Sequence, residues 1–593
     1  QETMSHPLSG NSAEGNALAS FMLGWGGACN MGNGAGQSYD LTSLAAARSY
    51  GGYLQDDIRI TPKLTINMGI RYEVQLPSTE RHNRYTTFDM DAPSPLASAV
   101  KGAANCPACA DLRGGYVFMS DKNRRAYNTD RNDIGPRFGF AYQFAPHMVL
   151  RGGYGIYYGL SSAGLTAELG DGFITSTAWN YSSDGGITQN ATLVNPFPNG
   201  IDQPVGSANG MMQGVGDVAY GPNPENNVTP YFQQWNLSVQ RELGFNSVIE
   251  IAYSGTKGTH LGFGTMRTAP SLFDASYLTS LGDKLLEQVP NPFYGLVPAT
   301  SSMATPTIQR RYLLSRFPQF YYYSERPGPP IASSIYHGLQ FKFRKRLSHG
   351  LQTTIHYTFS KAITDSDAAD DPNVDWLGGA IGINGSGRPR VQNWGNLRLE
   401  RSESTFDIKH RFVADFSYQL PIGRNQAIGK NWNRALDLVA GGWQVNGILI
   451  ASTGVPLVPH LQGNGTIGGI GMAQRPNVTG DPSTSGSVVS RLNKYLDSSA
   501  FSRPASWVSG TAPRTMGYVR APGFHGMDAS LFKQFMLNDE RSRYFELRGE
   551  AFNLTNTPIF SVPNTTWGSS GFGIISGQAN GSRSVQLAAK FYF

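Results

Sequence analysis

The sequence predicts an all-β protein, an antiparallel transmembrane β-barrel with about 14 strands and long extracellular loops. Three observations predict this fold: short segments of alternating apolar and polar residues, connections that are alternately short and long, and an unusual composition. Charged residues make up 15% of the 593 residues, whereas soluble proteins carry about 25%. Glycine (70 residues), tyrosine (28) and phenylalanine (31) are abundant, which suits a sheet with many turns and one face against lipid.

The hydropathy of the chain argues against a membrane-spanning helix. The mean hydropathy is −0.30, and the sequence contains no run of about 18 apolar residues, the length that a helix needs to cross a bilayer. Alternating strands, in contrast, hide their hydrophobicity from window averages. Two classes therefore remain, a transmembrane β-barrel and a large secreted β protein.

The clearest predicted strand covers residues 64–73. Its apolar and polar residues occupy different faces, because successive side chains of a strand point to opposite sides. The apolar face consists of Leu64, Ile66, Met68, Ile70 and Tyr72. Pro62 presets a tight turn before this strand. The turn follows a less regular strand at 53–60, in which Asp56 falls on the apolar face.

The same hairpin of two alternating strands recurs along the chain. Further strands are predicted at 138–144, 150–158, 235–239, 249–253, 339–343, 351–359, 412–420, 443–449, 527–531, 545–551 and 585–593. Together these segments make thirteen strands. If the short turns and the end of the last strand are both periplasmic, an even barrel needs one more strand near the start. We expect it at 17–24, the only candidate segment.

Long connections separate the hairpins and are rich in Gly, Pro, Asn and Ser. They cover 74–133, 159–231, 255–334, 361–410, 452–524 and 555–583. Structureless loops of this length are rare in compact soluble domains. Outer-membrane barrels, however, combine short periplasmic turns with long extracellular loops. The loop pattern therefore favours the barrel.

A soluble β-sandwich or propeller is the alternative fold, since its strands would show the same alternation. A propeller should also show a fixed repeat period, and the chain has none. Several predicted strands carry a tyrosine at or near their end, which suits the aromatic girdles at membrane interfaces. These tyrosines are Tyr72, Tyr158, Tyr253, Tyr357 and Tyr418.

The last ten residues carry alternating apolar positions and a terminal aromatic residue. Val585, Leu587, Phe591 and Phe593 are the candidate residues of an assembly signal, because this end resembles the segment that the outer-membrane assembly machinery reads on barrel proteins. An aromatic C-terminal strand is common by itself. Together with the loop pattern, it predicts a protein of the bacterial outer membrane.

Several strand and turn segments resemble the Oar-like TonB-dependent receptors, a family that contains a carboxypeptidase-regulatory-like domain. The segments are YLQDDIRITPKLTINMGIRY at 53–72, NDIGPRFGF at 132–140, AYSGTKGTHL at 252–261, HYTFSKA at 356–362 and RGEAFNLTNTP at 548–558. The resemblance spans about residues 50–593, without the long loops. Because these segments are strands and turns in the family, they indicate a fold more firmly than a substrate.

The resemblance implies a barrel of about 22 strands, preceded by a signal peptide, the regulatory-like domain, a TonB box and a plug. None of these is visible here, so we expect residues 1–593 to be the C-terminal barrel portion, with about eight strands ahead of Gln1. The implied function is import of an unidentified small solute or oligomer. The implied partners are outer-membrane lipid, the barrel assembly machinery and the TonB complex, which would act through the missing N-terminal region.

Other functions stay open at this point. Some Oar-like proteins are suspected of protein export or surface assembly, and a plug with a TonB box upstream would favour import instead. A self-contained fourteen-strand porin-like channel would need a signal peptide directly before Gln1. A soluble β adhesin should purify without detergent. Nucleic-acid binding has little support, because the 48 basic and 42 acidic residues are scattered along the chain.

No constellation of residues points to an enzyme, a cofactor or a metal. Cys106 and Cys109 have redox or zinc spacing, but no second ligand pair accompanies them, so we favour a local disulfide over free thiols and free thiols over a metal. Acidic residues gather at 365–375. A calcium-binding EF-hand loop would need glycine at Asp370 and glutamate at Trp376, so we interpret this segment as a solvated loop.

Charged residues on the polar strand faces would line the lumen, where a ladder of hydrogen bonds is their commonest role. These residues are Arg71, Glu73, Arg344, His356, Asp415, Glu546, Arg548 and Glu550. For a solute, the candidate contacts are aromatic residues of the long loops, although such residues often serve only in packing. The candidates are Tyr321, Tyr322, Tyr323 and Trp376.

Overall fold

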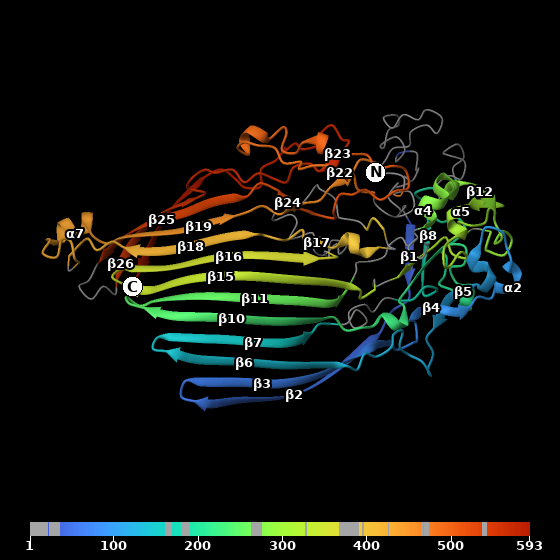
Figure 1. Cartoon of the computed structure of the whole chain (residues 1–593), viewed down its shortest axis with the longest axis horizontal. Coiled ribbons are helices and arrows are strands. Elements are labelled where there is room, and N and C mark those ends of the chain that lie inside the picture. The colour runs from blue at the N-terminus through green and yellow to red at the C-terminus, as the bar shows by residue number, and fades with distance from the viewer. Residues whose placement is uncertain are drawn as a thin grey trace.

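A computed structural model of the chain contains one large antiparallel sheet, which we call the wall (Figure 1). The structure describes residues 22, 36–160, 169–178, 190–262, 276–299, 301–325, 329–366, 391–393, 396–424, 426–463, 467, 474–536 and 543–593. Thirteen strands follow one another along the wall, each hydrogen-bonded to the next, so the thirteen strands expected from alternation are confirmed. They are β2 (Ala45–Thr61), β3 (Leu64–Glu80), β6 (Asp133–Ala145), β7 (Met148–Tyr158), β10 (Tyr231–Leu243), β11 (Ser247–Leu261), β15 (Ala332–Ser348), β16 (Leu351–Thr364), β18 (His410–Gln419), β19 (Trp443–Ser452), β25 (Phe524–Met536), β26 (Tyr544–Phe552) and β28 (Ser584–Tyr592).

The fourteenth strand of the wall is not the expected one. It is β17 (Ser402–Glu403), which pairs with β16 beyond the main path. The segment expected to supply it, 17–24, lies outside the described residues apart from Met22, which is helical. Strands β2 and β28 are the two ends of the path, and no ladder between them is found among the described residues. Among the described residues, the wall is therefore not closed by pairing of these two strands.

The register of the wall places apolar side chains opposite one another on one face. Ile251 lies opposite Val239 on β10 and Phe341 on β15, and Met68 lies opposite Phe138 on β6. A slip by one residue would move every side chain to the other face, so this match fixes the register. Most of these apolar side chains are exposed in the protein alone, as a lipid-facing surface requires.

The hairpin turns at one end of the wall are short. In the β15–β16 turn, His349 and Gly350 have φ values of 51° and 78°, and two such residues match the right-handed twist of the flanking strands. The connection between β18 and β19 is the exception at this end. It contains a short helix, α7 (Arg434–Ala440), which extends beyond the strand ends at the left of Figure 1.

The long connections at the other end contain short strands and helices of their own. Segments from 74–133, 159–231 and 255–334 share a hydrophobic core, which we call the first cap. Its short elements bring together buried residues from all three connections. They are β4 (Thr86–Pro93), α2 (Ala97–Val100), η1 (Pro107–Asp111), β5 (Arg113–Phe118), η2 (Gly210–Met212), β9 (Val218–Gly221), η3 (Pro224–Asn226), β12 (Gln288–Pro290), β13 (Thr307–Gln309), α5 (Arg310–Leu313) and β14 (Tyr322–Glu325).

A second group of segments, from 452–524 and 555–583, shares another core, which we call the second cap. Its elements are β20 (Pro456–Leu457), β21 (His460–Leu461), β22 (Asn477–Val478), η7 (Val489–Arg491), η8 (Ser498–Ala500), β23 (Phe501–Ser502), β24 (Met516–Arg520) and β27 (Thr566–Trp567). Four further elements are β1 (Gly36–Asp40), which pairs with β8 (Ile174–Ala178), and α4 (Ser276–Leu281), which leads into η4 (Gly282–Leu286). One more short helix, η6 (Leu397–Glu400), precedes β17. None of the described helices is long and apolar enough to cross a membrane.

Candidate functional site

The polar face of the wall carries charged and amide side chains that bond to one another. In β3, Arg71 pairs with Glu73 at 2.5 Å between Nη2 and Oε1. Across strands, Asn446 Nδ2 donates to Ser530 Oγ at 3.1 Å. These polar groups form hydrogen bonds and ion pairs with one another. Because the face carries such groups, it is suited to contact with water and with hydrophilic solutes.

A connected ladder occupies the polar face near the C-terminus. Glu546 accepts from Arg548 on its own strand and from Gln534 Nε2 on β25 at 2.8 Å. Arg548 Nη2 also donates to the Tyr592 hydroxyl on β28 at 3.0 Å, and Gln586 Nε2 donates to Glu550 at 3.1 Å. The ladder expected for these carboxylates and this arginine is therefore confirmed.

The remaining predicted lumen residues occupy polar positions in the centre of the wall. Arg344 and Asp415 both lie opposite Thr354, one from each neighbouring strand. His356 lies opposite Lys342. This stretch of the polar face thus mixes both signs of charge, as expected for a lumen lining and not for a single-sign binding patch.

The first cap is organised around Phe88 of β4, which is fully buried. Its ring contacts those of Tyr116, Phe317, Phe320 and Tyr323, with centroid separations between 4.2 and 5.8 Å. Aromatic side chains bury large areas and pack in such edge-to-face pairs. This core joins loops far apart in the sequence, so the cap is a folded unit at the end of the wall (Figure 1).

The three loop tyrosines that were candidate solute contacts have different environments. Tyr323 is 3% exposed, and its hydroxyl donates to the Gly221 carbonyl at 3.0 Å. Burial raises the pKa of Tyr323 well above its usual range. Tyr323 is thus a core residue. Tyr321 and Tyr322 are half-buried at the margin of the same core.

Tyr321 belongs to a small group of phenols beside a guanidinium. Its ring stacks on Tyr312 at 4.5 Å, and the Tyr312 hydroxyl donates to the Tyr321 oxygen at 2.6 Å. Burial, and then this hydrogen bond, raise the pKa of Tyr312 to about 12. Arg311 lies over the Tyr312 ring at 4.7 Å. The group therefore places two phenol rings next to a positive charge.

The candidate disulfide is present, and the acidic segment is only partly described. Cys106 and Cys109 are joined with an S–S distance of 1.98 Å inside the first cap. Asp365 accepts from the backbone and hydroxyl of Ser333, so this carboxylate has a local structural role. The other acidic residues of that segment, and Trp376, lie outside the described residues. Within the described ranges, no group of three His, Cys, Asp or Glu side chains could hold a metal ion.

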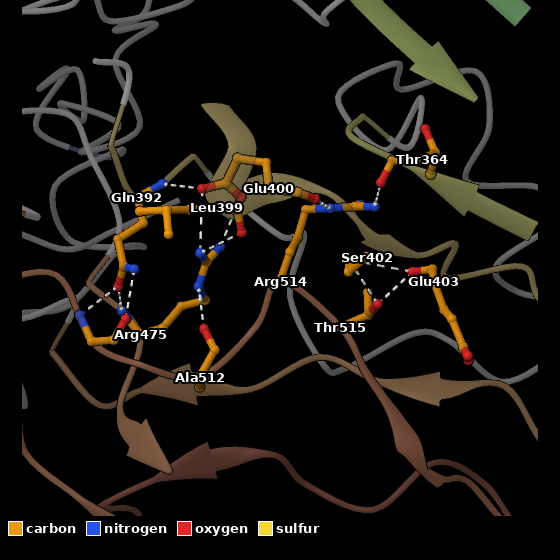
Figure 2. Close-up of polar contacts among 11 residues, drawn as sticks. Thr364, Gln392, Leu399, Glu400, Ser402, Glu403, Arg475, Ala512, Arg514 and Thr515 are labelled. Carbon is orange, nitrogen blue, oxygen red and sulfur yellow. Dashed lines mark hydrogen bonds and ion pairs between the residues drawn. The ribbon is translucent and has the colours of Figure 1, made fainter. Parts of the chain in front are cut away.

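A buried ion pair that sequence reasoning missed links η6 to the second cap (Figure 2). Glu400 Oε2 and Arg475 Nη1 lie 2.7 Å apart, and the two side chains are 0% and 6% exposed. Arg475 Nε also donates to the Ala512 carbonyl at 3.0 Å, and Glu400 accepts from the Gln392 backbone at 3.1 Å. These additional bonds offset the cost of removing both charges from water.

Two further arginines extend this network toward the wall. Arg514 donates to the Glu400 carbonyl at 2.7 Å and to the Thr364 carbonyl, at the end of β16, at 2.8 Å (Figure 2). Arg520 pairs with Glu403 at 2.6 Å and with Asp407 at 2.5 Å. No local pattern marks these residues, since Glu400 and Arg475 are 75 positions apart in the chain.

Trp507 joins the connection 452–524 to the α4–η4 segment of the connection 255–334. Trp507 packs with Leu278 and Leu285 of the α4–η4 segment and with Ile467. Its indole nitrogen donates to Asp283 Oδ1 at 2.7 Å. This contact holds two of the long connections together at the loop end of the wall.

The candidate assembly-signal residues lie together on β28. Val585, Leu587 and Phe591 are exposed on its apolar face, and Phe593 follows the strand end, also exposed. Phe591 lies opposite Phe545 of β26. Their placement continues the lipid-facing surface to the end of the chain.

Comparisons with known proteins point to one family. A family model described as "Outer membrane beta barrel domain" matches residues 2–586. No curated protein matches the chain. Among solved structures, three similar ones are the ferripyoverdine receptor of the outer membrane of Pseudomonas aeruginosa, the ferric-catecholate import receptor Fiu from K12 E. coli and the outer membrane transporter YddB from Escherichia coli.

These three structures share little sequence with the chain. Identities are 9%, 12% and 9%, and TM-scores are 0.34, 0.36 and 0.38, in the same order. The alignments cover 93%, 93% and 92% of this chain but only 39%, 45% and 55% of those chains. The chain therefore spans roughly half of the length of these structures, or less.

Proposed function

Because the chain belongs to the outer membrane β-barrel domain family, and so lies in the bacterial outer membrane, we propose that it is the barrel of an Oar-like TonB-dependent receptor. In this proposal residues 1–593 form the C-terminal barrel portion of the receptor. The receptor imports a small solute or oligomer, and energy arrives from the TonB complex through an N-terminal region. The segments that resemble the Oar-like family support the assignment.

One observation carries the proposal of a transport function. The wall has one exposed apolar face and one hydrogen-bonded polar face, and the loops at one end fold into caps over it. A surface of this kind supports passage of a hydrophilic solute along the polar face, with first contact at the caps. Backbone groups of paired strands are satisfied within the wall, which allows the wall to stand in hydrocarbon.

The first contact with the solute is proposed at Tyr321 and Tyr322. Their rings are half-buried at the cap margin, so part of each ring can meet a solute. Arg311 nearby supplies a positive charge. Tyr323 is left out of this proposal because its ring lies in the core.

The function is tested by following solutes in whole cells. Cells with and without the protein, each with intact or inactivated TonB, are incubated in a mixed solute pool, and uptake is measured by mass spectrometry. The proposal expects at least one solute to accumulate only when both the protein and TonB are present. Tyr321→Ala should lower that uptake, whereas Tyr321→Phe, which keeps the ring, should retain most of it.

The other functions give different results in the same assay. Uptake that needs the protein but not TonB would indicate a porin-like channel. Unchanged uptake together with loss of surface proteins would indicate export or surface assembly. Recovery of the protein in the soluble fraction would indicate an adhesin and contradict the membrane assignment.

A further inference from the structure

The helix α7 is the one described helix at the short-turn end of the wall (Figure 1), and its larger apolar side chains are exposed. It begins after Asn433, whose side chain accepts from the Leu436 backbone, and it ends at Gly441. No residue of the helix is buried. A seven-residue helix is marginal by itself in water, so its environment must contribute to its stability.

The apolar side chains of this segment face outward. Val439 is 72% exposed and Leu436 is 45% exposed, and their spacing of three residues places them on one side of the helix. Ile428, earlier in the same connection, is 55% exposed. Exposed apolar groups gathered on so short a segment indicate a surface that something else covers.

The charges of the same segment are mostly positive. Residues 420–442 contain Arg424, Lys430 and Arg434, and their single acidic residue is Asp437. Asp437 is occupied within the segment, where Oδ1 accepts from the Arg424 backbone at 2.6 Å. The three basic side chains are exposed. The segment therefore combines apolar groups with cations, as helices that lie on anionic membrane surfaces do.

The segment is attached to the lipid-facing side of the wall. Lys533 of β25 lies in phase with the apolar Leu531, and its ammonium group donates to the Gly441 carbonyl at the helix end. The same ammonium lies 5.3 Å from the ring of Trp443 and 5.1 Å from that of Phe535. An aromatic and cationic girdle of this kind is typical of a membrane–water interface. The end of α7 is thus joined to the lipid-facing face of the wall.

We propose that α7 and its flanking residues form an interfacial anchor that binds anionic phospholipid at the short-turn side of the membrane. Leu436 and Val439 enter the interface, and Arg424, Lys430 and Arg434 contact lipid phosphates. This inference needs the membrane location of the chain but not solute import. Charge complementarity and continuity with the lipid-facing wall favour lipid over a protein partner.

The test places a fluorescent probe on the helix in the full chain. In a Cys29→Ser background, Val439→Cys is labelled with an environment-sensitive dye, and Ser485→Cys in an exposed loop of the second cap serves as the reference. The proteins are reconstituted into phosphatidylcholine vesicles with or without one-fifth phosphatidylglycerol. Quenching by a spin label attached near the lipid headgroup is measured at both positions.

The proposal expects several-fold stronger quenching at position 439 than at position 485 in vesicles with phosphatidylglycerol. Replacing Arg424, Lys430 and Arg434 by Gln should reduce quenching at 439 to its value in phosphatidylcholine alone. Unheated electrophoretic mobility would show that each variant is folded.

Three results would overturn the proposal. Position 439 could be as accessible to water as position 485 in both kinds of vesicle. Its quenching could be strong but independent of phosphatidylglycerol and of the three cations, which would remove the role of anionic lipid. Protection could also arise only after a periplasmic extract is added, which would assign the surface to a protein.

Discussion

Replacing Glu400 by Gln removes the negative charge of the buried pair with Arg475 while keeping the shape of the side chain. Arg475 keeps its bond to the Ala512 carbonyl, but its guanidinium loses the carboxylate and stays out of water, since it is 6% exposed. Breaking a buried pair by removing one partner costs about 3–5 kcal/mol. We expect the second cap, and not the wall, to bear this loss.

This loss of stabilising free energy corresponds to a large increase in how often the second cap opens locally. At about 1.4 kcal/mol per factor of ten, the segment that opens with Arg475 should do so roughly a hundred- to several-thousand-fold more often. Amide hydrogen exchange followed by mass spectrometry would detect this as faster exchange in peptides from 396–403 and 510–520. Peptides from the wall strands should be unchanged, because their hydrogen bonds do not involve the pair.

Two further variants make the test specific. Glu400→Leu combined with Arg475→Met removes both charges at similar volume and should restore much of the protection, because well-packed apolar replacements of buried pairs are often nearly neutral. Lys494→Gln removes the exposed ion pair with Asp497 and should change nothing measurable. If Glu400→Gln exchanged no faster than Lys494→Gln, the reasoning from burial would be refuted.

Three other predictions concern the wall and the first cap. Ile251→Arg, on the apolar face, should lower the free energy of unfolding of the barrel by roughly 2–4 kcal/mol, measured by urea unfolding in lipid. Gln240→Arg, on the polar face, should lower it only slightly. Equal effects of the two changes would mean that the faces are misassigned. Deleting residues 591–593 removes their pairing with β26 and exposes backbone groups that cannot form hydrogen bonds in hydrocarbon. The shortened chain should therefore be degraded before it reaches the outer membrane. Deletion of residues 485–487 should not have this effect. Because the pKa of Tyr312 is about 12 in the folded cap and about 10 when unfolded, its contribution to stability should be full below pH 10 and disappear as the pH rises through 12. Tyr312→Phe should therefore reduce the alkaline loss of the near-UV circular dichroism signal, and an unchanged alkaline transition would contradict the assignment.

The strands of the wall could be predicted because their signal is local. The period of two along residues 64–73 places Ile66 and Asn67 on opposite faces of the strand. The same alternation of apolar and polar residues located all thirteen long strands. The apolar stripe, the order of the hairpins and the disulfide of Cys106 and Cys109 also followed from neighbours in the sequence. Membrane location followed from the stripe together with the loop lengths.

The count of fourteen was reached by a different strand from the expected one. The parity argument pointed to 17–24, whereas the described wall gains β17, a pair of residues inside a long connection. Two residues carry no periodicity, so only their pairing with Ile363 and Thr364 identifies them as a strand. The placement of Tyr323 in the core of the first cap depended in the same way on its neighbours in space.

What the sequence determined by itself is the alternation of the strands and hence the two-faced wall, since each side chain's direction depends only on its position along a strand. Only the tertiary structure decided that the long loops fold. Phe88 meets Phe317 and Glu400 meets Arg475 across long stretches of chain, and no period or motif links such partners. Their association is decided by the burial of apolar area and the pairing of buried charge, which exist only once the wall has brought the loop ends together.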